Sequence, residues 1–90
     1  MARPAPDAVK LVACVGGGTI GSGWAACFLS RGMSVVMSDP GPDAEARARA
    51  VIDQAWPHLT ELGMAQGASR DRFRFVATAS EAVAEADVVQ

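Results

Sequence analysis

Five glycines fall within the eight positions from Gly16 to Gly23, directly after the apolar run LVACV at residues 11–15. Glycine loses more backbone freedom on folding than any other residue, so such a cluster weakens the element that contains it. A chain keeps it only where a tight turn, or a close approach of another group to the backbone, leaves no room for a side chain. This stretch therefore constrains the fold more than any other part of the sequence.

Apolar runs and stretches of helical periodicity alternate along the chain. Strands are predicted where the apolar residues are nearly consecutive, at residues 9–15, 34–39, 73–78 and from 87 onward. Helices are predicted between them, at residues 19–30, 43–62 and 79–85, the last opened by a capping box at Thr78–Glu81. The order β-α-β-α-β-α-β predicts an α/β fold. We expect a Rossmann-type, doubly wound parallel sheet, of which this chain would form the N-terminal, ADP-binding half.

The helical spacing also predicts which side chains pack inward. In the first helix the apolar residues Ile20, Trp24, Cys27 and Phe28 share one face, and Ser22 is expected at the surface. In the second helix, with Asp43 as its N-cap, the inward stripe is expected at Val51, Ala55, Leu59 and Leu62. Pro57 lies inside this helix, so a kink or break is expected near residues 53–56.

The glycines have the spacing Gly16-x-Gly18-x-x-Gly21 between a predicted strand and a predicted helix. Asp39 stands at the end of the next strand, 18 residues after Gly21. This is the arrangement of dinucleotide-binding folds. Gly16 would allow the tight turn off the strand, Gly18 would leave room for the pyrophosphate, and Gly21 would let the helix pack closely. Amides at the start of the helix would then point at the phosphates.

The candidate cofactor-binding residues are Gly16, Gly17, Gly18, Thr19, Ile20, Gly21 and Asp39. A carboxylate at position 39 would accept hydrogen bonds from the ribose hydroxyls and repel a 2′-phosphate. No arginine follows it directly, so NAD is favoured over NADP. FAD stays a minor alternative, because FAD-binding domains share the glycine pattern. The alternative to a binding site is that the glycines form a purely structural turn and that Asp39 caps a turn or helix.

In the stretches VGGGTIGSGWAACFLSRGMSVVMSDP and LGMAQGASRDRFRFVATASEAVAEADVVQ the sequence resembles the NAD-binding domain of the 3-hydroxyacyl-CoA dehydrogenase family. Gly23 completes the G-x-G-x-x-G-x-G pattern of that family. The pair Trp24-Ala25 and the segment Ala55-Trp56-Pro57 look more like its L-carnitine dehydrogenase and lambda-crystallin branch.

The resemblance implies an NAD-dependent oxidoreductase of fatty acid metabolism, acting on the CH–OH group of a 3-hydroxyacyl-CoA or of a related 3-hydroxy acid such as carnitine. It implies NAD(H) as partner and a homo-oligomer. In the family the catalytic histidine, its glutamate partner and the helical domain follow the fourth strand. No catalytic residue is therefore expected in this chain, and His58 does not match the catalytic position. We expect a disordered tail at residues 1–8 and a partial NAD-binding domain at residues 9–90.

Composition argues against several other classes of protein. The net charge is −2 and no basic stripe is present, so nucleic acid is not an expected partner. No segment approaches the ~20 apolar residues that span a bilayer. Cys14 and Cys27 lie in apolar surroundings without metal-ligand spacing, which fits two buried thiols in a reducing, cytoplasmic compartment better than a metal site or a disulfide. The alternative function is a non-catalytic nucleotide-binding or crystallin-like module.

Overall fold

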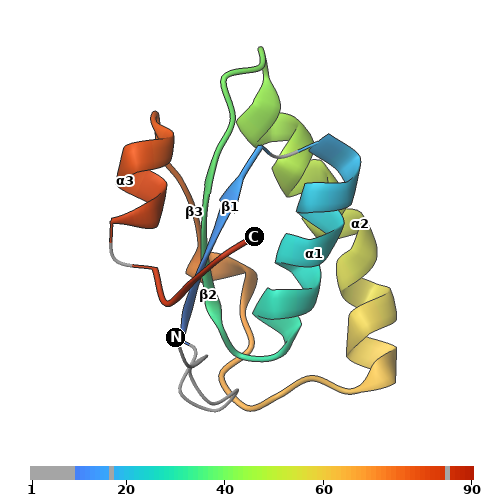
Figure 1. Ribbon diagram of the computed structural model, residues 1–90. Coiled ribbons are helices and arrows are strands. Elements are labelled where there is room, and N and C mark those ends of the chain that lie inside the picture. The colour runs from blue at the N-terminus through green and yellow to red at the C-terminus, as the bar shows by residue number, and fades with distance from the viewer. Residues whose placement is uncertain (1–9, 17, 85) are drawn as a thin grey trace.

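Four parallel strands lie side by side in one sheet in the order β3-β2-β1-β4 (Figure 1). The strands are β1 (Leu11–Val15), β2 (Ser34–Ser38), β3 (Phe73–Phe75) and β4 (Val88–Val89). This computed structural model describes residues 10–16, 18–84 and 86–90, so the tail predicted at residues 1–8 lies outside the described residues. The four strands confirm the predicted parallel sheet.

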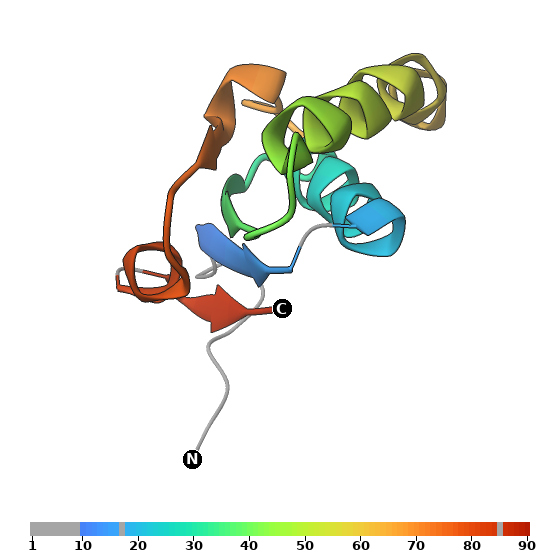
Figure 2. The same ribbon diagram turned by 90° about the horizontal axis from the view of Figure 1, so that it is seen from above.

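Helices cover both faces of this sheet (Figure 2). The helices α1 (Gly18–Ser30) and α2 (Ala44–Leu62) lie together on one face, and α3 (Ala79–Val83) lies on the other. A single turn of 3₁₀ helix, η2 (Arg70–Arg72), leads into β3. Crossover helices on opposite faces make the sheet doubly wound, which confirms the predicted fold class.

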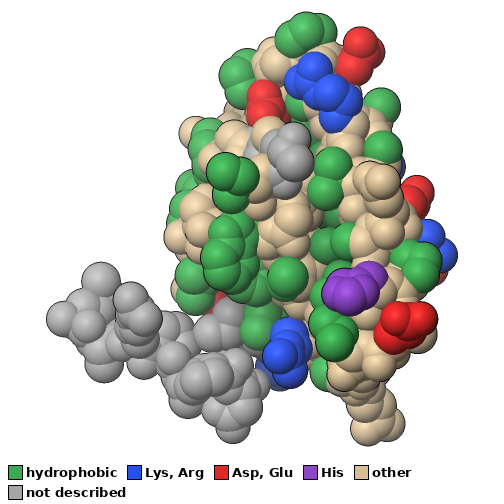
Figure 3. All heavy atoms as spheres, turned by 90° about the vertical axis from the view of Figure 1, so that its right-hand side faces the viewer, with side chains coloured by type: hydrophobic (Ala, Val, Ile, Leu, Met, Phe, Trp, Pro, Cys, Tyr) green, Lys and Arg blue, Asp and Glu red, His purple; other side chains and the backbone are tan. Residues whose placement is uncertain are grey.

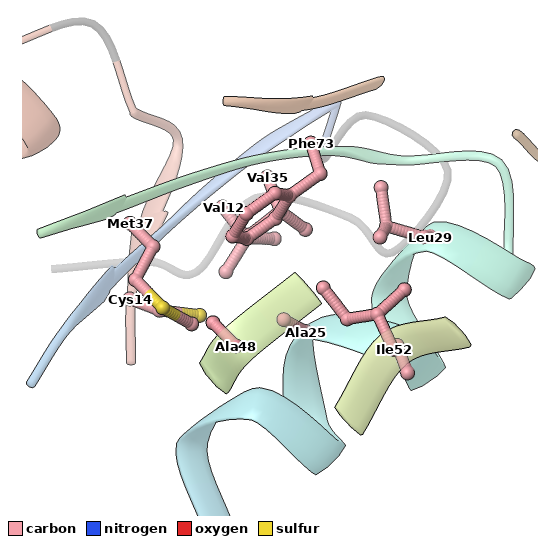
Figure 4. Close-up of a cluster of buried hydrophobic side chains, with 10 residues drawn as sticks. Val12, Cys14, Ala25, Leu29, Val35, Met37, Ala48, Ile52 and Phe73 are labelled. Carbon is pink, nitrogen blue, oxygen red and sulfur yellow. The ribbon is translucent and has the colours of Figure 1, made fainter. Parts of the chain in front are cut away.

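The larger part of the core lies between the sheet and the helices α1 and α2 (Figure 4). Alternate side chains of β1 and β2 point into it and meet side chains of both helices; the labelled members are Val12, Cys14, Val35, Met37, Phe73, Ala25, Leu29, Ala48 and Ile52. The intervening strand residues Ala13 and Val36 point to the other face, where they pack against Ala82 of α3. Burial on both faces explains why the strands read as continuous apolar runs.

The inward face of α1 differs from the predicted one. Its buried residues are Ser22, Ala25, Ala26, Leu29 and Ser30. Ile20 is 80% exposed, and Trp24 lies at the surface with its ring stacked on Phe28. Phe28 is partly buried against the core, as predicted, but the inward positions predicted for Ile20, Trp24 and Cys27 were wrong. At Gly21 the first turn of α1 packs directly against the glycine turn, and the small residues Ala25 and Ala26 lie next to the sheet.

The two cysteines have different environments. Cys14 is buried in the core, and burial raises the pKa of its thiol to about 11. Cys27 is exposed on the outer side of α1, so the prediction of two buried thiols was wrong for this residue. Both cysteines are free thiols in the structure.

Helix α2 also packs through a stripe shifted from the predicted one. Its buried residues are Ala44, Ala48 and Ile52, with Ala55, Trp56 and Leu59 partly buried against the same core. Leu62 is 71% exposed, so its predicted inward position was wrong. The helix runs through Pro57 without the expected break. Packing of Ile52 and Leu59 on either side of the proline holds both halves against the sheet, and the exposed ring costs one backbone hydrogen bond.

The start of α3 follows its sequence pattern. The Thr78 side chain accepts a hydrogen bond from the Glu81 backbone N–H at 3.2 Å, and its hydroxyl donates to the Glu81 carboxylate at 3.1 Å. This confirms the N-cap half of the predicted capping box, which satisfies one of the unpaired N–H groups at the start of a helix, while the Glu81 carboxylate bonds the Thr78 hydroxyl and not its backbone N–H. By contrast, Asp43 before α2 has a φ of 57° and makes no side-chain capping bond, so its predicted capping role was wrong.

Asp87 ties the start of β1 to the turn before β4. Its Oδ2 accepts hydrogen bonds from the backbone N–H groups of Lys10 at 2.9 Å and Leu11 at 3.0 Å. Its own backbone N–H donates to the Leu11 carbonyl at 2.9 Å. The bonds from Lys10 and then Leu11 lower the pKa of the Asp87 carboxyl from its usual 3.8. The side chain therefore helps to set the register of β4 against β1.

This pairing predicts a pH dependence of stability. A carboxyl whose pKa is lower in the folded state than in the unfolded state stabilises the fold above the unfolded value, near pH 4, and loses that contribution as the pH falls through the folded value. We expect the difference in urea midpoint between the wild-type chain and Asp87→Asn to be constant from pH 7 to about pH 5 and to shrink below that. Midpoints that run parallel down to pH 2.5 would contradict a role for the Asp87 charge.

Candidate dinucleotide-binding site

The glycine turn and Asp39 lie together at the carboxyl edge of the sheet. Gly16 follows the last residue of β1, and its backbone N–H donates to the Ser38 carbonyl at the end of β2 at 2.8 Å. Asp39 comes next in the chain after Ser38. This hydrogen bond therefore holds the two parts of the predicted motif side by side, although 22 residues separate Gly16 from Ser38 in the sequence. In open α/β sheets this edge is where ligands bind.

In the glycine turn, Gly16 and Gly18 have backbone conformations that residues with a side chain rarely adopt. Gly16 has a φ of 82° and Gly18 a φ of 55°, which turn the chain sharply from β1 into α1. Apart from its chain neighbours and the backbone of its own helix, no described atom lies within 4 Å of the point where a Cβ on Gly18 would stand, so this side of the turn is open. This open space is the cradle that a pyrophosphate would need.

Gly21 is required for a different reason. A Cβ at this position would lie 2.8 Å from the Gly16 carbonyl oxygen, closer than real side chains approach a backbone oxygen. The absence of a side chain lets the first turn of α1 pack directly against the strand-to-helix turn. The structure thus agrees with the role that spacing predicted for Gly21.

The remaining predicted residues of the turn are described only in part. Gly17 lies outside the described residues, and so does the side chain of Thr19. Thr19 and the exposed Ile20 belong to the first turn of α1. The first N–H groups of a helix have no partner within it, and together with the helix dipole they favour an anion. The beginning of α1 thus faces the open space above Gly18 with donors that suit phosphate oxygens.

Ser22 supports the glycine turn from inside the fold. It is 2% exposed, and its hydroxyl donates to the Gly18 carbonyl at 2.7 Å. The prediction that Ser22 lies at the surface was wrong. A small hydroxyl residue four positions after a turn glycine was the available signal, since serine commonly bonds back to a carbonyl one helical turn earlier.

Asp39 is half-buried at the end of β2. Its Oδ1 accepts a hydrogen bond from the Gly41 backbone N–H at 2.7 Å, the bond of an Asx turn. The carboxylate therefore has the turn-capping role considered for it, and this bond fixes its orientation beside the glycine turn. The two oxygens of a carboxylate have about four lone-pair sites between them.

Two hollows border the start of α2. One, of about 320 Å³, lies between α1 and α2 and is lined by Gly18, Ser22, Ala44, Arg47, Ala48 and Val51. The other, of about 540 Å³, lies toward β3, and its lining includes Gly41, Glu45, Arg49 and Phe75. The arginine in the first hollow was not singled out from the sequence, because the rotation of α2 that aims it there depends on the tertiary packing.

The described residues offer no centre of another kind. His58 is exposed on α2 (Figure 3). Within residues 10–16, 18–84 and 86–90, no three histidine, cysteine, aspartate or glutamate side chains gather where they could share a metal ion. Of the helices in that part of the chain, none has both the length and the apolar character to cross a membrane.

A parallel sheet with a glycine turn after its first strand and an acid after its second defines a dinucleotide-binding α/β domain. The chain belongs to the family described as 3-hydroxyacyl-CoA dehydrogenase, NAD binding domain, which residues 11–90 match. The family predicted from the sequence is thereby confirmed, and NAD is the cofactor of that family.

Several curated relatives are L-carnitine dehydrogenases. That of Nocardiopsis dassonvillei is 58% identical over 99% of this chain, and that of Streptomyces coelicolor is 54% identical over 94% of it. The chain spans about a quarter of these relatives, 27% of the length of each.

Solved structures show the same fold. The NAD⁺-dependent 5-formyl-3-hydroxy-2-methylpyridine 4-carboxylic acid 5-dehydrogenase is 36% identical, with a TM-score of 0.76 over 90% of this chain and 26% of that one. The (S)-3-hydroxybutyryl-CoA dehydrogenase PaaH1 of Ralstonia eutropha, at 22% identity and a TM-score of 0.69, shares the fold over 91% of this chain and 30% of its own.

Proposed function

We propose that this chain is the NAD(H)-binding part of an L-carnitine dehydrogenase-like oxidoreductase that acts on the CH–OH group of a 3-hydroxy substrate. The partial NAD-binding domain would comprise residues 9–90. The observation that carries the proposal is the hydrogen bond from Gly16 to Ser38, because it sets the glycine turn beside Asp39 at the carboxyl edge of the sheet. The identity to L-carnitine dehydrogenases supports carnitine, a 3-hydroxy acid, as the substrate of the complete enzyme.

The residues would divide the binding of NAD between them. The amides at Gly18, Thr19 and Ile20 would hold the pyrophosphate, with Gly16, Gly17 and Gly21 shaping the turn. Asp39 would accept hydrogen bonds from the adenosine ribose hydroxyls, in the orientation that Gly41 imposes. Bound NAD would supply the hydride acceptor. The catalytic residues would belong to the rest of the enzyme, and we propose a cytoplasmic homo-oligomer of fatty acid metabolism.

Calorimetric titration of the chain with ADP-ribose, after circular dichroism has verified the fold, tests this proposal. We expect ADP-ribose to bind and its 2′-phosphorylated analogue to bind much more weakly. Asp39→Asn keeps an oxygen for the Gly41 N–H but removes the charge. It should weaken ADP-ribose about tenfold or more, the value of a hydrogen bond to a charged group.

Asp53→Asn is the matched control. Asp53 lies on the exposed side of α2, where it pairs with Arg70 at 3.0 Å, so its replacement should leave ADP-ribose binding unchanged. A folded chain that binds no ADP-ribose would contradict the proposed site and would favour a purely structural turn. An equal loss for both variants would show that the effect is not specific to the site, and unchanged ADP-ribose binding by Asp39→Asn would contradict a contact between Asp39 and the ribose.

A further inference from the structure

Arg47 reaches the same point above the β2–α2 turn as Asp39, although eight positions separate them in the sequence. A Cβ on Gly41 would lie 3.0 Å from Asp39 Oδ1 and 3.3 Å from Arg47 Nη2. The carboxylate and the guanidinium therefore flank one spot. Gly41 has an ordinary φ, so glycine is needed there for space and not for its backbone conformation.

Arg47 also lines the hollow between α1 and α2. Among the described residues that line the hollow with Gly18 and Ser22, beside the glycine turn, Arg47 is the charged one. Arg49, two residues later, points the other way. Its guanidinium lies 5.0 Å from the centre of the Phe73 ring and pairs with Glu45 at 3.0 Å, on the side of the sheet edge at β3. Arg49 also borders the hollow at Gly41, but its guanidinium contacts Glu45 and Phe73, whereas that of Arg47 lies beside the Asp39 carboxylate.

From this geometry we propose that Arg47 is a specificity-determining residue for the 2′-position of the ribose. Its guanidinium would bind a 2′-phosphate, but the negative charge of Asp39 prevents that phosphate from binding. The inference rests on the proposed NAD site. A ribose held by Asp39 places its 2′-position beside the carboxylate, and a phosphate there would lie within reach of the guanidinium. Arginine suits phosphate because its planar fork donates two parallel hydrogen bonds. In the wild-type chain the carboxylate repels that phosphate.

This changes the reason for the expected preference for NAD. No arginine directly follows Asp39 in the sequence, where NADP-binding proteins commonly have one. In the folded chain α2 supplies one from a later position. The preference would therefore rest on the Asp39 carboxylate alone and not on a lack of positive charge at this spot.

Calorimetric titration of four chains with ADP-ribose and with 2′-phospho-ADP-ribose tests the inference. The chains are the wild type, Asp39→Asn, Asp39→Asn with Arg47→Gln, and Asp39→Asn with Arg49→Gln as the matched control. Glutamine keeps most of the arginine stem and removes the charge. We expect Asp39→Asn to raise the affinity for the 2′-phosphorylated ligand about 10- to 100-fold, the range of a charge-assisted contact. Adding Arg47→Gln should abolish that gain, whereas adding Arg49→Gln should leave most of it.

The outcomes separate this inference from the proposed function. If the wild-type chain binds ADP-ribose but Asp39→Asn gains no affinity for the 2′-phosphorylated ligand, the inference is overturned and the NAD site stands. A gain that survives Arg47→Gln overturns it in the same way. If the folded wild-type chain binds neither ligand, the proposed site fails and the inference fails with it. Should circular dichroism show that Asp39→Asn is unfolded, Asp39→Ser, which also offers an oxygen to Gly41, takes its place.

Discussion

We expect Gly21→Ala to lower the free energy of unfolding by about 1–3 kcal/mol, the usual cost of forcing extra atoms into a packed site. The added Cβ would stand 2.8 Å from the Gly16 carbonyl oxygen. That oxygen belongs to the backbone of the glycine turn, so relief requires α1 or the turn itself to move. Because the same movement would disturb the open space above Gly18, binding of ADP-ribose should weaken together with stability. Urea denaturation and calorimetric titration of the same preparation measure the two effects.

Gly23→Ala is the matched control for this substitution. Gly23 lies in the same helix two residues later, and outside its own stretch of helix no described atom lies within 4 Å of its Cβ position. Alanine is a better helix former than glycine by about 1 kcal/mol, so this variant should be more stable than the wild type. Opposite signs at the two positions would identify the close contact at Gly21 as the cause. Stabilisation by both substitutions would mean that α1 does not approach the turn as closely as the structure shows.

We expect Leu29→Ala to destabilise the chain by about 2–5 kcal/mol, because it removes a fully buried side chain and leaves a cavity. Leu29 is 0% exposed and packs from α1 into the core formed with β1, β2 and α2 (Figure 4). Since folded domains are stable by only about 5–15 kcal/mol in total, such a loss takes a large part of the stability. The change in urea midpoint, with circular dichroism as the signal, measures it.

Leu62→Ala provides the comparison. Leu62 is also a leucine near the end of a helix, but it is 71% exposed. Its replacement should change stability by no more than about 0.5 kcal/mol, as for most surface positions. A large loss at Leu62 together with a small one at Leu29 would support the inward stripe that helical periodicity predicted for α2, and would contradict the packing described above.

Most of the fold is predictable from the residue types within short stretches of the chain. Burial on both faces makes the strands of a parallel sheet read as apolar runs, and VKLVACV and SVVMSD were recognised in this way. The cap at Thr78 is a contact between residues three apart, so its pattern is visible in the chain itself. Helical periodicity did not predict which side of α1 faces the sheet. It ranked Ile20 and Trp24 as inward because they are large and apolar, although the close approach at Gly21 turns the small residues Ala25 and Ala26 toward the sheet.

The α/β class, the glycine turn and the acid of the candidate site follow from the amino-acid sequence, because each depends on residue type and on spacing along one stretch of chain. The surroundings of these residues depend on tertiary packing. The hydrogen bond from Gly16 to Ser38 joins the ends of two different strands. The burial of Ser22 against Gly18 and the position of Arg47 beside Asp39 depend on how a helix is rotated. Rotation and approach are set by packing against the sheet as a whole, which no local pattern of residues encodes.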